Sequence, residues 1–256
     1  MSESSAEPEP QLQSPPPSPH HRRLRLLRRH PSAFLLAAQL ASLLVYGAID
    51  DTRAGRWLFG TIAAVVVPLT VWVVNRTPAV TRVAWLLAIP AMLLTAIGIA
   101  TDGDRWLAVS ALLEALLYFY AAASLMAYML RDHRVTRDEL FAVGATFTLL
   151  AWGFAYAYFV CQTWFPGSFT GLEPERPRTW LELLFLSFTN LSSTGLSDVV
   201  PIRPMARALV MIEQLAGLAY VAFFVSRVVG LTLNRARSSA PAPREPASTE
   251  SAETQG

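Results

Sequence analysis

Long apolar blocks separated by short polar loops dominate this chain. Six such blocks occupy residues 34–49, 57–74, 83–100, 106–130, 141–165 and 205–233. A helix needs about 20 apolar residues to cross the hydrocarbon core of a bilayer. The pattern therefore predicts an all-α membrane protein with six transmembrane helices, the first of them short and the last long enough to tilt or project.

The connection between the fifth and sixth blocks differs from the others. Residues 166–178 are polar, and residues 179–192 are mostly apolar and long enough for about four helical turns, too few to cross. An uncharged run of small hydroxyl residues follows, within the stretch SFTNLSSTGLSDVVP at 187–201. Irregular backbone survives at membrane depth only where protein or a water-filled cavity satisfies it. This predicts a re-entrant pore helix and filter, with an interfacial helix and surface loop as the alternative.

Composition and charge agree with a membrane location. The chain is 53% hydrophobic and 16% charged, and its mean hydropathy is +0.35. Arginines gather in the run HHRRLRLLRRH at 20–30, in the loops at 76–82 and 131–137, and at 235–237, whereas the other loops carry Asp50, Asp51, Asp102 and Asp104. Because positive loops stay in the cytoplasm, we expect a multi-pass plasma-membrane protein with both termini cytoplasmic.

Four regions follow from these patterns. Residues 1–30 are predicted to be a disordered, arginine-rich cytoplasmic arm, and residues 236–256 a disordered cytoplasmic tail. Residues 31–130 would form a four-helix membrane domain, and residues 131–235 the pore domain. A voltage sensor repeats arginine at every third position of its fourth span. The segment at 106–130 has no arginine, and its one charge is Glu114.

The region from 180 to 233 resembles the pore module of bacterial potassium channels. That family's filter reads T-V-G-Y-G-D, and the residues on those six positions here are Ser193, Thr194, Gly195, Leu196, Ser197 and Asp198. Ser192 precedes them and Pro201 follows. Downstream, residues 204–230 are similar to the family's inner helix, with Glu213 behind the filter and Gly217 at a hinge position.

The resemblance implies a homotetramer in the lipid bilayer, with a pore lined by residues 193–198. The ligand would be a permeating monovalent cation, K⁺ and with it Na⁺, and no other cofactor, metal or nucleic acid is implied. Two positions depart from the family. Ser197 replaces a glycine, and a left-handed backbone costs an L-residue about 1–2 kcal/mol. Leu196 replaces tyrosine and lacks its hydroxyl. We therefore expect a looser outer half, weak potassium selectivity and an acidic ring of Asp198 at the outer mouth.

The alternative function is that of a non-conducting membrane scaffold or sensor with a degenerated pore fold. Walker, Rossmann and nucleophile-elbow motifs are missing from the sequence, so nothing in it supports an enzyme. Glu114 is either a functional intramembrane acid or a hydrogen-bonded packing residue. The single cysteine, Cys161, is expected to pack in the core.

Overall fold

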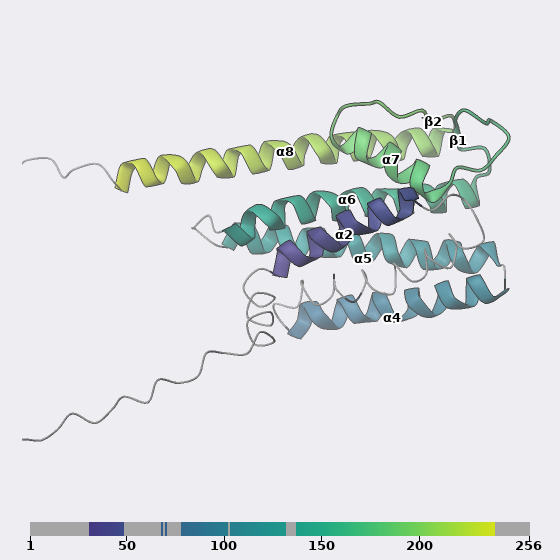
Figure 1. The fold of residues 1–256 in the computed structure, drawn as a ribbon, viewed down its shortest axis with the longest axis horizontal. Helices are drawn as coiled ribbons and strands as arrows, with labels where there is room; N and C mark the ends of the chain where they lie inside the picture. Colours follow the sequence, from purple (N-terminus) through teal and green to yellow (C-terminus); the bar gives the residue numbers. More distant parts are fainter. Residues whose placement is uncertain are drawn as a thin grey trace, which may run out of the picture.

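The structure, a computed structural model, describes residues 31–48, 68, 70, 78–101, 103–131 and 137–238. Helices account for most of these residues, and two short strands pair near one end (Figure 1). In chain order the elements are α2 (Pro31–Ala48), α4 (Pro78–Thr101), α5 (Asp104–Arg131), α6 (Arg137–Trp164), β1 (Phe169–Thr170), α7 (Trp180–Leu191), β2 (Val200–Pro201) and α8 (Pro204–Ser238).

Four of the described helices are long and apolar enough to cross a membrane, at Arg82–Thr101, Arg105–Leu130, Leu140–Trp164 and Pro204–Arg227. They coincide with the third to sixth predicted spans. The first predicted span corresponds to α2, which is a shorter apolar helix. The second, at 57–74, lies outside the described residues except for 68 and 70, so the count of six spans stays a prediction. The arm at 1–30 and the tail beyond residue 238 also lie outside them, whereas 236–238 continue α8.

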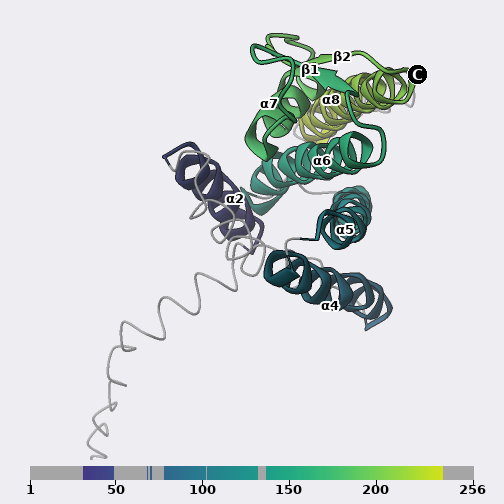
Figure 2. The same ribbon diagram turned by 90° about the vertical axis from the view of Figure 1, so that its right-hand side faces the viewer.

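Successive helices pack side by side, α4 on α5 and α5 on α6, with α2 lying across α6 (Figures 1 and 2). The α2 and α6 helices point in the same direction: the Ser32 hydroxyl donates to Asp138 Oδ2 (3.1 Å) near the start of both, and the Thr148 hydroxyl donates to Gln39 Oε1 (2.5 Å) further along. Because α5 reverses direction between α4 and α6, α2 and α4 also run in the same direction (Figure 1).

Two hydrophobic clusters form the core. One joins α2, α4, α5 and α6, and the other joins α6, α7 and α8 and includes the buried Cys161. The start of α7 reaches into the first cluster, since the Trp180 ring lies 5.0 Å from Trp152, 5.3 Å from Tyr46 and 5.4 Å from Tyr156, measured between ring centroids. The short helix is thereby held by the N-terminal helices as well as by α6.

Glu114 is buried in the first cluster. Its Oε1 accepts a hydrogen bond from the Thr95 hydroxyl at 3.1 Å, which joins α5 to α4. This contact agrees with the packing interpretation of the residue, because buried polar groups are stabilised by such partners.

Candidate functional site

Local sequence signals account for both ends of α7. Thr179 is its N-cap: the Thr179 hydroxyl accepts from Glu182 N (3.2 Å), while Thr179 N donates to Glu182 Oε2 (2.6 Å). This reciprocal capping box satisfies two amides that a helix start leaves unpaired. The C-cap is Ser192. A helix over 179–192 is thus confirmed, and its insertion into the membrane as a re-entrant element stays a prediction.

The candidate filter begins in the turn that ends α7. Ser193 N donates to Asn190 O (3.0 Å), and Thr194 N donates to Thr189 O (2.9 Å). Ser193 has φ 59°, the left-handed conformation that this Schellman pattern requires and that glycine usually supplies. Gly195, with φ 64°, is the next left-handed position.

This finding corrects the expectation for Ser197. Among the described non-glycine residues, Ser193 alone has a positive φ, so the φ of Ser197 is not positive. The cost of about 1–2 kcal/mol therefore falls at the inner end of the filter. The reason is local, because the chain must reverse at Ser193 to pair the last carbonyls of α7, and Ser197 lies beyond this helix end.

The carbonyl of Thr189 holds the inner part of the filter. It accepts from Thr194 N (2.9 Å), from Gly195 N (3.1 Å), and more weakly from the hydroxyls of Thr194 (3.2 Å) and Ser192 (3.3 Å). The two hydroxyl oxygens also lie 3.0 Å apart. The hydroxyls of Ser192 and Thr194 are thus directed to the helix, and the segment from 192 to 195 is tied to the end of α7.

The outer part of the filter has fewer contacts within its own chain. The Leu196 side chain is 77% exposed, and Asp198 is exposed beside it. The Ser197 hydroxyl accepts from Val199 N at 3.1 Å, a local turn that a serine side chain commonly makes. The six predicted filter residues thus form one continuous loop between α7 and β2, and most of it faces away from the protein.

Glu213 joins three helices behind this loop. Fully buried on α8, it accepts hydrogen bonds from the hydroxyls of Tyr158 on α6 and Ser187 on α7. Ser187 also lies within hydrogen-bond distance of the Ala151 carbonyl on α6 (2.8 Å). The sequence singled out Glu213 but missed its partners, because Tyr158 stands among aromatic residues typical of packing and Ser187 is one of several hydroxyl residues in the stretch 187–197.

Gly217 lies one turn beyond Glu213, where α8 touches the end of α7. A Cβ added at Gly217 would overlap the Leu191 carbonyl group and come within 3.0 Å of its Cα. The close backbone contact explains why a glycine stands here. A hinge at this position stays a prediction.

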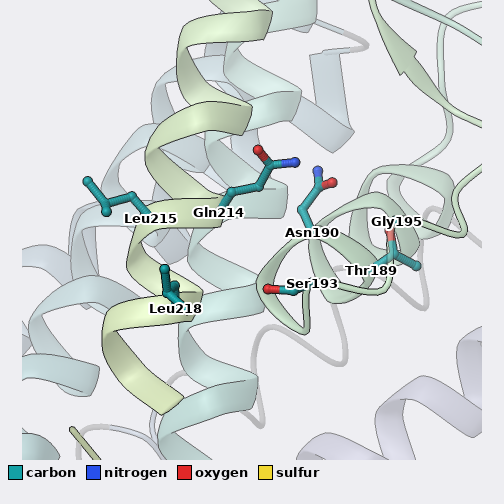
Figure 3. Close-up of a pocket in the computed structure, with 7 residues that line it drawn as sticks. All are labelled: Thr189, Asn190, Ser193, Gly195, Gln214, Leu215 and Leu218. Carbon is teal, nitrogen blue, oxygen red and sulfur yellow. The ribbon is translucent and has the colours of Figure 1, made fainter. Parts of the chain in front are cut away.

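A pocket of about 470 Å³ opens between the C-terminal end of α7 and α8 (Figure 3). Its lining residues are Thr189, Asn190, Ser193, Gly195, Gln214, Leu215 and Leu218. The amides of Asn190 and Gln214 extend toward one another across it (Figure 3). Asn190 lies beside the Glu213 carboxyl, yet its buried Nδ2 has no hydrogen-bond partner among the described residues. The pocket therefore connects the base of the filter with the polar groups behind it.

Comparison with known proteins identifies this part of the chain. The family model described as "Ion channel" matches residues 144–233, which run from α6 into α8 and contain every candidate site residue. Neither the curated proteins nor the solved structures give a match. The match supports a potassium-channel-like pore module at residues 144–233, and with its apolar helices the chain is a multi-pass membrane protein.

Proposed function

We propose that four copies of this chain form a cation channel that conducts monovalent cations through residues 193–198. The observation that carries the proposal is an exposed polar loop at the end of α7, inside the region matched by the ion-channel family. One copy cannot enclose an ion path, and its polar loop would otherwise face lipid, where unpaired backbone groups are costly. Closed rotational symmetry around this loop supplies the missing walls.

The uncovered face of α8 supports such an assembly. Large apolar side chains recur on it at helical spacing and stay exposed in the single chain, namely Met211, Leu215, Leu218, Val225 and Val229. Leu215 and Leu218 also line the pocket beside Ser193. This face, which no other described helix covers, is therefore continuous with the candidate filter, as expected of a helix that lines a central cavity and contacts other copies.

The charges of the pore loop favour cations. Four copies of Asp198 would place an acidic ring at the outer mouth, where it raises the local cation concentration. The C-terminal end of α7 lies at the pocket, and its partial negative charge acts in the same direction. Because Leu196 has no hydroxyl to bind a pore helix, we propose weak discrimination between K⁺ and Na⁺.

The proposed topology has six spans, cytoplasmic termini and an external loop at 166–178. The parallel run of α2 and α4 supports it, since a chain that crosses in the same direction twice must return between them, and the apolar segment at 57–74 is long enough to do so. A cysteine placed at Glu175, in a Cys161→Ala background, should react with an impermeant thiol reagent from outside intact cells. Reaction only after the membrane is opened would contradict this topology.

Flux through the purified full chain in liposomes tests the function. We expect K⁺ and Na⁺ to pass when either gradient is imposed, and chemical crosslinking in membranes to give a ladder that ends at four. A monomer or dimer in native membranes would overturn the tetramer. A tetramer without flux of either ion would favour the non-conducting scaffold or sensor.

A further inference from the structure

The outer end of the filter is joined to the loop that precedes α7. The strands β1 and β2 pair antiparallel, with Phe169 opposite Pro201 and Thr170 opposite Val200. Beyond the strands, Ile202 N donates to Ser168 O at 2.8 Å, and Arg203 N approaches the same carbonyl at 3.4 Å. We call these contacts, between residues 168–170 and 200–203, the outer sheet.

The 166–178 loop has a firm base on α6. At its start, the fully buried Ser168 donates its hydroxyl to Phe165 O (2.5 Å). At its end, the Gln162 amide pairs with the backbone of Arg178, with Nε2 donating to Arg178 O (2.9 Å) and Oε1 accepting from Arg178 N (3.1 Å). Both ends of the loop are therefore hydrogen-bonded to the C-terminal end of α6 or to the residue just after it.

A buried arginine holds the middle of the loop. The Arg178 side chain is fully buried, and its guanidinium donates to the carbonyls of Glu173 and Arg176. It also lies 3.7 Å from Glu182 in the first turn of α7. These contacts tie the loop to the pore helix as well as to α6.

The filter itself provides little restraint at its outer end. Leu196 projects away from its own chain and brings no hydroxyl, whereas Val199, immediately before β2, is buried in the cluster with Phe169. Within one chain, residues 199–203 are thus held by the outer sheet, by the core beneath it and by Arg207 of α8, whose Nε donates to Pro201 O (3.3 Å).

We propose that the outer sheet positions the outer half of the filter and sustains its conducting shape, with Ser168 as the positioning residue. The inference rests on the proposed channel function. The external 166–178 loop then supplies the restraint that a filter tyrosine would supply from behind. If this pairing weakens, the segment from 196 to 199 loses its outer support and leaves the conducting shape sooner.

Ile202→Pro tests this proposal because it removes the N–H that Ser168 O accepts. Pro201 already lies in a strand, the conformation that a following proline favours. Ile202→Ala is the matched control, since it truncates the same half-exposed side chain and keeps the donor. We expect K⁺ flux into liposomes to decay about two- to tenfold faster in Ile202→Pro, the range for loss of one hydrogen bond, and to be unchanged in Ile202→Ala.

Two further readouts separate positioning from general damage. Raising K⁺ should slow the decay in Ile202→Pro, because ions that occupy the filter stabilise its conducting shape by mass action. Oxidising the pair Thr170→Cys and Val200→Cys, in a Cys161→Ala background, should restore the slow decay to Ile202→Pro and lose it again on reduction. The two residues face each other in register, at a spacing that a disulfide tolerates.

Equal decay in Ile202→Pro and Ile202→Ala would overturn the proposal, and so would a disulfide that forms without restoring flux. If Ile202→Pro does not assemble, the cysteine pair alone decides: oxidation should leave flux intact, and a channel silenced by oxidation would show that the outer sheet must open during conduction.

If the unmodified chain carries no flux, the channel function fails separately. The rate of disulfide formation then measures how closely β1 and β2 pair. Equal rates with and without Ile202→Pro would overturn the proposed role of the outer sheet.

Discussion

The helices α6 and α8 both pack against α7, but they differ in how much of their surface is buried within the chain. In the apolar window of α6, 61% of the residues are buried, against 22% in that of α8. α6 packs against α2, α5, α7 and α8, whereas the helices that α8 contacts extensively are α6 and α7. Within the described chain, α6 is a buried core helix, whereas α8 keeps an exposed apolar face beside the candidate filter.

The two faces of α8 show the same difference on a smaller scale. The covered face carries Glu213 and Gly217, one with buried hydrogen bonds and the other with a backbone contact. The open face carries Leu215 and Leu218, which are exposed. Changes on the covered face should therefore alter the fold of a single chain, and changes near the open face should alter assembly or conduction.

The largest expected effect is that of Gly217→Ala. The added methyl group would overlap the Leu191 carbonyl and force α8 away from α7, at a cost of about 1–3 kcal/mol or more per chain. Gly47→Ala is the control, because a Cβ there meets no atom of the described residues within 4 Å. Thermal unfolding in mild detergent should show a lower midpoint for Gly217→Ala alone. Equal midpoints would mean that the α7–α8 contact is not close in the folded protein.

The next effect concerns the carboxyl that joins three helices. Tyr158→Phe and Ser187→Ala each remove one donor from Glu213 and should each lower the free energy of unfolding by about 1–3 kcal/mol. Because both contact one carboxyl, their effects should not add, with a coupling of about 0.5–3 kcal/mol in a double-mutant cycle. Strict additivity in denaturant titrations would indicate that the two hydroxyls act independently.

A smaller effect is expected when the two departing filter residues are restored together. Leu196→Tyr with Ser197→Gly should shift flux toward K⁺ over Na⁺, by about fivefold if the gain is about 1 kcal/mol. Since Ser197 has no positive φ, the glycine adds backbone freedom here and does not relieve strain. Flux ratios under matched K⁺ and Na⁺ gradients measure this shift. A parent chain already strongly selective for K⁺ would refute the weakened-filter argument.

The smallest effect should come from Asp198→Asn. Conductance should fall most near 0.01 M salt, where the screening length is about 30 Å, and the difference should vanish near 1 M, where it is about 3 Å. Glu175→Gln removes an exposed acid from the 166–178 loop and is the control. An equal loss in both variants would point to general surface charge rather than a ring at the pore mouth.

Some features of the molecule could be predicted because their causes lie close together in the sequence. Hydropathy over about 20 residues located four of the spans, since the bilayer acts on each helix separately. The limits of α7 were predicted from the apolar stretch at 179–192, and its cap residues in the structure are Thr179 and Ser192. The order of the filter residues marked the candidate site, and the family match covers it.

Other features required the tertiary structure, because their partners are far apart in the sequence and no local pattern links them. Glu213 meets Ser187 across 26 positions and Tyr158 across 55. The left-handed serine is Ser193 rather than Ser197, because the hydrogen bonds to the last carbonyls of α7 require a turn at Ser193, whereas the glycine positions of the family's filter had pointed to Ser197. Ile202 N donates to the Ser168 carbonyl because the C-terminal end of α6 and the N-terminal end of α8 lie close together. Hydropathy determined which segments enter the membrane, and the packing of α6, α7 and α8 decided which polar groups meet there.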